Sequence, residues 1–140
     1  MKTAVVVVTV VYQCMISQYS PGVMREVVHN RQMAQAIPHS LPDVDGFVAV
    51  RDCERIGAIV WLKPEGGQWE SFLAVDCAHS DEVRAWMDGH NVWSLPIAAE
   101  VDYPTAVRWR TVGDMQPGYV MVAEHVLVPM SRARPPYLME

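Results

Sequence analysis

Positive charge is scarce in this chain of 140 residues, and lysine most of all. Lys2 and Lys63 are the only lysines, the arginines are scattered, and the formal net charge is −5 at pH 7. Proteins that bind nucleic acids or anionic membrane surfaces gather Lys and Arg on one face. The sequence therefore predicts neither a nucleic-acid-binding protein nor one that binds membranes through a basic surface.

No hydrophobic run is long enough to span a bilayer, which takes about 20 apolar residues in a helix. The most apolar segment, Ala4 to Val11, follows Lys2 and resembles the core of a short signal peptide. No small-residue cleavage site follows it, and its valines favour a strand buried on both faces. We prefer the strand. An export signal would instead place the protein in the cell envelope or outside the cell.

Cysteine is also sparse: Cys14, Cys53 and Cys77 include no Cys-x-x-Cys pair. Because the spacings of zinc ligands are missing, we expect no metal site, and no motif indicates a cofactor. The sequence has no Gly-x-Ser-x-Gly element of a serine hydrolase either. In an oxidising compartment we expect a Cys53–Cys77 disulfide and one free thiol, whereas in the cytosol we expect three buried thiols.

About half of the residues are hydrophobic, which is enough for one folded domain over residues 1–130 with a loosely held tail at 131–140. The strands are too irregularly spaced for a parallel βαβ array, so we expect a small closed barrel. Strands are predicted at 4–11, 46–51, 56–62, 68–76, 97–101 and 119–128, and helices at 20–35, 81–88 and, as a single turn, 104–109.

Two aspartates stand out because each interrupts an apolar segment. Asp76 ends the predicted strand 68–76, and Asp102 lies where the strand 97–101 gives way to a helical turn. A carboxylate at a strand end can project into a groove while the sheet fixes its position, as a general acid or base requires. Alternatively, both aspartates cap turns by accepting hydrogen bonds from nearby backbone amides.

Five segments follow one another in a recognisable order. They are 38–42 (Pro-His-Ser-Leu-Pro), 47–50 (Phe-Val-Ala-Val), 74–78 (Ala-Val-Asp-Cys-Ala), 100–109 (Glu-Val-Asp-Tyr-Pro-Thr-Ala-Val-Arg-Trp) and 117–122 (Pro-Gly-Tyr-Val-Met-Val). This order resembles the double-psi β-barrel family of rare lipoprotein A, the expansins and the Gram-positive 3D domain, over roughly residues 17–128. The resemblance implies a mainly β fold: a six-stranded double-psi β-barrel with two or three short peripheral helices.

The resemblance also implies a function at the cell wall. In lytic transglycosylases with this fold, a carboxylate protonates a glycosidic oxygen and the muramyl 6-hydroxyl closes an anhydro ring. Asp76 would be that acid, with Asp102 and His39 beside it. The substrate would be peptidoglycan or a similar polysaccharide. Aromatic and polar side chains would bind the glycan, namely Trp93, Trp69, Tyr103 and His79.

Two other functions remain open. The sequence departs from the family pattern after Asp76, where Cys77-Ala78-His79 replaces Arg-Gly-Pro, and before His39, where a helix containing Arg25 and Glu26 replaces a polar segment. The chain could therefore be a non-catalytic barrel that binds a polysaccharide or a protein. It could also be an assembly module encoded by a phage or mobile element. The sequence defines neither the glycan nor the oligomeric state.

Overall fold

The computed structural model describes residues 2–78, 80–89 and 95–129, which form six strands, three α-helices and one 3₁₀ turn. The strands are β1 (Thr3–Gln18), β2 (Gly46–Val50), β3 (Ile59–Pro64), β4 (Glu70–Cys77), β5 (Ile97–Val101) and β6 (Gln116–Pro129). The helices are α1 (Val23–Met33), α2 (Asp81–Gly89) and α3 (Tyr103–Trp109), with the 3₁₀ turn at Cys53–Arg55. Among the described residues, no helix has the length and apolar character needed to cross a membrane.

The six strands form a closed barrel in the order β1-β5-β2-β4-β3-β6. The pairs β1–β5 and β2–β4 are parallel, and the other pairs are antiparallel. The pairing is internally symmetric: exchanging β1 with β4, β2 with β5 and β3 with β6 reproduces every pair and its direction. The predicted mainly β, closed-barrel architecture with short helices is thus confirmed.

Alternate residues of each strand fill the barrel. Phe72 and Ala74 of β4, Val48 of β2 and Leu62 of β3 are fully buried in this interior. The ring of Trp109, from α3, packs edge-on against Phe72 with ring centroids 5.8 Å apart. This continuous apolar interior is what the period-two pattern of the strands produces when a sheet closes on itself.

Two helices cover parts of the barrel's outer surface. Met24 and Val28 of α1 pack on Leu73 and Val75, the outward-facing residues of β4. On another part of the surface, Met87 of α2 belongs to a second apolar cluster with Met15 of β1 and Ile97 of β5. Helix α1 begins at Val23, with Gly22 as its N-cap residue at a φ of 81°, and not at residue 20 as the sequence predicts. The barrel therefore has apolar packing on both its inner and outer surfaces.

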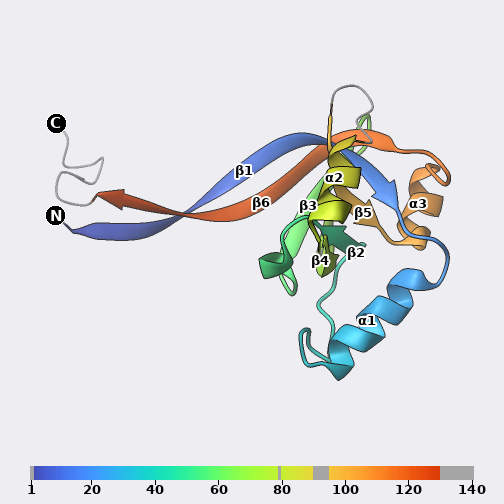
Figure 1. Ribbon diagram of the computed structural model, residues 1–140, viewed down its shortest axis with the longest axis horizontal. Coiled ribbons are helices and arrows are strands. Elements are labelled where there is room, and N and C mark those ends of the chain that lie inside the picture. Colours follow the sequence, from blue (N-terminus) through green and yellow to red (C-terminus); the bar gives the residue numbers. More distant parts are fainter. Residues whose placement is uncertain (1, 79, 90–94, 130–140) are drawn as a thin grey trace.

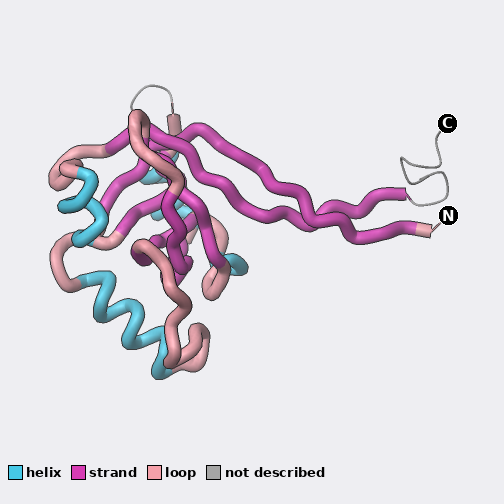
Figure 2. Tube along the Cα trace, turned by 180° about the vertical axis from the view of Figure 1, so that it is seen from behind, coloured by secondary structure: helices cyan, strands magenta, loops and turns pink. Residues whose placement is uncertain are grey.

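The expectation that residues 4–11 form a strand buried on both faces is half wrong: the strand is there, but it is exposed. Residues 3–10 of β1 pair only with residues 122–129 of β6, and the two strands leave the barrel together as a long twisted ribbon (Figures 1 and 2). We call these two segments the arm. Val5 is 62 % exposed and Leu127 72 %. Apart from Val10 and Val122, which pack against the barrel core, the arm is exposed because no third strand or helix in the described part of the chain covers it.

Candidate functional site

A β-bulge in β4 determines where Asp76 points. Ala74 pairs with Val48 and Asp76 with Ala49, so Val75 is an extra residue in the ladder between β2 and β4. Strict alternation after Phe72 and Ala74 would direct Asp76 into the apolar barrel interior. The extra residue resets the alternation, as bulges do, and places Asp76 on the outer surface beside Val75. The bulge is therefore what keeps a charged side chain out of the core.

Asp76 belongs to a line of residues that crosses four adjacent strands. Asp76 of β4 pairs with Ala49 of β2, Ala49 with Glu100 of β5, and Glu100 with Ser17 of β1. Because directly paired residues lie on the same face of a sheet, these four side chains share the barrel's outer surface. We call this line the polar row. A second register irregularity, in the β1–β5 pairing, leaves Ala98 as an extra residue in β5 and brings Glu100 opposite Ser17.

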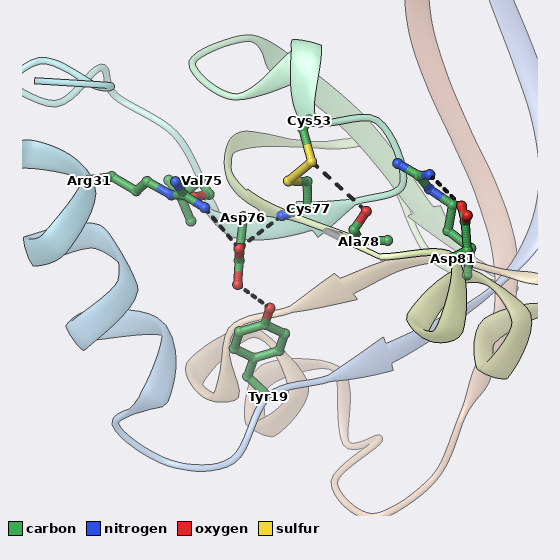
Figure 3. Close-up of a disulfide and its surroundings, with 9 residues drawn as sticks. Tyr19, Arg31, Cys53, Val75, Asp76, Cys77, Ala78 and Asp81 are labelled. Atoms are coloured by element: carbon green, nitrogen blue, oxygen red, sulfur yellow. Dashed lines mark hydrogen bonds and ion pairs between the residues drawn. A yellow bond between two sulfur atoms is a disulfide. The ribbon is translucent and has the colours of Figure 1, made fainter. Parts of the chain in front are cut away.

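The carboxylate of Asp76 accepts three hydrogen bonds from different elements (Figure 3). The hydroxyl of Tyr19 donates to Oδ2 at 2.6 Å, Nη2 of Arg31 donates to Oδ1 at 3.1 Å, and the amide of Cys77 donates to Oδ1 at 2.9 Å. The Asp76 and Arg31 side chains are only 17 % and 25 % exposed. Donors of this kind stabilise the ionised form of a carboxylate.

Arg31 also satisfies the backbone of the bulge. Its Nε donates to the carbonyl oxygen of Val75 at 2.9 Å, while Nη2 reaches Asp76. A bulge leaves its extra residue outside the regular ladder, so the Val75 carbonyl needs such a donor. Arg31 lies in the last turn of α1, where a positive charge also favours the negative end of the helix dipole. One guanidinium therefore fastens α1 to the bulged strand.

Glu100 is the second carboxylate of the polar row. Burial raises the pKa of Glu100, and the negative charge of Asp76 raises it further, while a hydrogen bond with Ser17 lowers it. Burial and hydrogen bonding to Asp76 likewise raise the pKa of Tyr19, so its phenol remains a donor. The two carboxylates therefore have different surroundings. Asp76 faces a guanidinium, and Glu100 faces a hydroxyl and another negative charge.

Asp102 has a different set of partners, and they are structural. It is the buried residue that precedes α3, and its Oδ1 accepts hydrogen bonds from the Thr105 hydroxyl at 2.6 Å and the Phe47 amide at 3.3 Å. Gly46 is required beside it, because a Cβ there would lie 2.7 Å from Asp102 Oδ1 and 2.8 Å from the Phe72 ring. Asp102 therefore ties the start of α3 to β2, but, contrary to the turn-capping alternative, its carboxylate does not cap the helix by accepting from the helix's own amides.

The remaining predicted site residues are dispersed. His39 is exposed on the loop after α1, where its carbonyl oxygen accepts from the Gln32 side chain and it lines a shallow pocket with residues 35–38. Trp69 is 37 % exposed in the β3–β4 connection. Tyr103, with Asp102, lines a pocket beneath the start of α1. Trp93 and His79 lie outside the described residues.

The cysteines follow the pattern expected for an oxidising compartment. Cys53, in the 3₁₀ turn, and Cys77, next to Asp76, form a disulfide, and Cys14 is a free thiol inside the barrel. Burial raises the pKa of the Cys14 thiol to about 12, so this thiol is unreactive. Within the part of the chain that the structure describes, no group of three His, Cys, Asp or Glu side chains is arranged to hold a metal ion.

Comparisons of the chain with protein-family models, with curated proteins and with solved structures gave no match. The class of protein is thus defined by its fold and site alone. It is a closed, six-stranded mixed β-barrel whose outer surface carries a polar row, with an ion pair to the covering helix. Sequence reasoning found Asp76 but not its partners Tyr19, Arg31 and Glu100. Their signal is weak because it depends on strand pairings between distant segments.

Proposed function

We propose that the chain is a non-catalytic barrel module that binds a partner protein, built on a double-psi scaffold. The scaffold assignment is supported by the internal symmetry of the strand pairing, with two parallel pairs, β1–β5 and β2–β4, on either side of an antiparallel centre. Each parallel pair also contains one register irregularity, with Val75 as the extra residue in β4 and Ala98 as the extra residue in β5. The family resemblance of the sequence points to the same fold.

The observation that carries this proposal is the hydrogen bonding of Asp76. A general acid must hold a proton and reach the substrate. Asp76 instead accepts from Arg31, Tyr19 and the Cys77 amide, which favours the carboxylate without a proton. Its neighbours lie under α1, which stands where the family has a polar segment. Asp76, which stands at the position of the family's acid, thus stabilises the packing of α1 on β4.

The arm supports protein binding as the function. It presents apolar side chains on both faces, with Val5 and Val7 62 % and 59 % exposed on one face and Val6 and Val126 38 % and 39 % exposed on the other. Exposed apolar surfaces of this extent mark protein contacts. The Cys53–Cys77 disulfide adds support for an oxidising compartment such as the cell envelope or the exterior.

The experiment is incubation of the purified protein with peptidoglycan, followed by mass spectrometry of the soluble products. The wild type, Asp76→Asn and Glu100→Gln should all release no anhydromuropeptides. Anhydromuropeptides from the wild type that disappear in either variant would overturn the non-catalytic proposal. A digestion with a known lytic enzyme on the same substrate verifies that products can be detected.

Cleavage of a cell-wall glycan is the second candidate function, and Glu100 is the residue that favours it. Its raised pKa, beside the ionised Asp76, is the pattern of an acid paired with a charge-stabilising carboxylate. Under this alternative Glu100, rather than Asp76, would donate the proton to the glycosidic oxygen. Glu100→Gln would then abolish product formation, whereas Ser17→Ala, which removes a partner of Glu100, would only reduce it.

A further inference from the structure

The arm is an incomplete sheet. Its two strands pair from Thr3–Pro129 to Val10–Val122, and each strand then has one edge with no strand partner in the described structure. The strands belong to opposite parts of the sequence, so no turn joins them at the far end of the arm (Figure 2). A two-stranded ribbon alone is marginally stable in water, and stability needs a third strand or a packed face. The arm therefore requires an occupant.

The β1 edge of the arm has none of the features that protect natural sheet edges. Such edges usually carry Lys, Pro, a bulge or an inward-pointing charge. Residues 3–10 of β1 read Thr-Ala-Val-Val-Val-Val-Thr-Val, with no charge, no proline and no register shift. By contrast, the β6 side of the arm contains Glu124 and ends at Pro129. The β1 edge is thus the open one.

We infer that the β1 edge of the arm pairs with the same edge of a second copy of this chain, which extends the proposed protein-binding function by naming the partner. Antiparallel pairing about a two-fold axis near Val7 would join two ribbons into one four-stranded sheet, β6-β1-β1-β6. Such an interface is closed, because each copy contributes the same surface. A second copy carries the same unprotected edge, so each copy both offers a strand for pairing and accepts one.

Charge favours this partner. Glu124 is the only Asp, Glu, Lys or Arg in the arm, and it is neutralised by Arg55 at 3.0 Å, so two arms can approach without repulsion. A strand paired with β1 would also cover part of its exposed apolar side chains, of which Val5 and Val7 are 62 % and 59 % exposed.

Sedimentation velocity of the full chain across the micromolar range tests the inference. The wild type should form a concentration-dependent dimer, and Val7→Lys should abolish it while the barrel stays folded by near-ultraviolet circular dichroism. Val107→Lys is the matched control: Val107 is 51 % exposed on α3, outside the arm, and its variant should still dimerise. A monomeric wild type, or a Val7→Lys variant that dimerises as well as the wild type, would overturn the inference.

Hydrogen exchange and a truncation identify the contact surface. As concentration rises, amides of residues 3–10 should become protected more than those of 122–129. The reverse order would refute pairing through β1. If the full chain is monomeric but a chain ending at Pro129 dimerises, residues 130–140 occupy the arm and the inference fails. None of these failures affects the glycan assay, which tests separately whether the barrel is non-catalytic.

Discussion

Strands β1 and β6 run through two regions of opposite character, the barrel and the arm. Within the barrel, Cys14 and Ile16 of β1 are 1 % and 2 % exposed, since β5 and β6 flank the strand and the other strands close around it. Within the arm, Val5 and Val7 of the same strand are 62 % and 59 % exposed. An apolar β-branched segment thus predicts a strand, but only its neighbours in space determine whether that strand is buried.

The largest expected difference between the two regions is in the free energy of unfolding. Phe72→Ala in the barrel should cost about 3–5 kcal/mol, because it leaves a cavity beneath Trp109. Leu127→Ala in the arm, where the side chain is 72 % exposed, should change stability by about 0.5 kcal/mol or less in the monomer. Urea denaturation at low protein concentration measures both. Equal losses would mean that the arm is already packed in the monomer.

Removal of the disulfide should weaken the barrel by a somewhat smaller amount. The Cys53–Cys77 bond closes a loop with a sequence separation of 24 residues. By restricting the unfolded chain, a loop of this length raises the free energy of unfolding by about 3 kcal/mol. Reductant should therefore lower the melting temperature of the wild type and of Cys14→Ala, whereas the Cys53→Ala/Cys77→Ala variant should not respond to it. If the reductant effect instead vanishes in Cys14→Ala, the disulfide involves Cys14 and the Cys53–Cys77 pairing is wrong.

The ion pair between α1 and the bulge should contribute less again. Asp76→Asn or Arg31→Gln should each cost about 1–2 kcal/mol, since either change leaves a partly buried partner unsatisfied. The double variant should cost less than the sum of the two, because the residues interact directly. The exposed pair Arg84–Asp81 is the control, where neutralisation should have no measurable effect. Losses of stability that add in the double variant would contradict a direct interaction between Asp76 and Arg31.

Glu100 gives the smallest effect and one that depends on pH. Because its pKa is raised in the folded protein by burial and by Asp76, ionisation of Glu100 destabilises the fold above the ordinary value of 4.5. Glu100→Gln should therefore melt at a higher temperature than the wild type at neutral pH, and the gap should close as the pH falls towards 4.5. The same substitution at the exposed Glu65 should show no such trend. A constant gap at every pH would exclude titration of Glu100 as its origin.

The site was predictable only in part. The apolar segment before Asp76 marks the end of a strand, so this residue could be found from local sequence. Arg31 could not, because it lies 45 residues away and meets Asp76 only when α1 folds onto β4. The sequence points to Asp102 as the second carboxylate, whereas the structure places Glu100 in the polar row and Asp102 at the start of α3. A bulge moves one residue out of register, and no periodicity in a single sequence reports it.

The sequence by itself determined the strands and helices, the mainly β class and the closed barrel, because these follow from apolar periodicity and from turn residues close in the chain. The tertiary structure decided everything that depends on pairing between distant segments. It placed Asp76 and Glu100 in one row on the outer surface with Ala49 between them, gave Asp76 the guanidinium of Arg31 as a partner, and joined Cys53 to Cys77. It also extended β1 and β6 beyond the barrel, where the most apolar segment of the chain meets solvent because no other described element lies beside it.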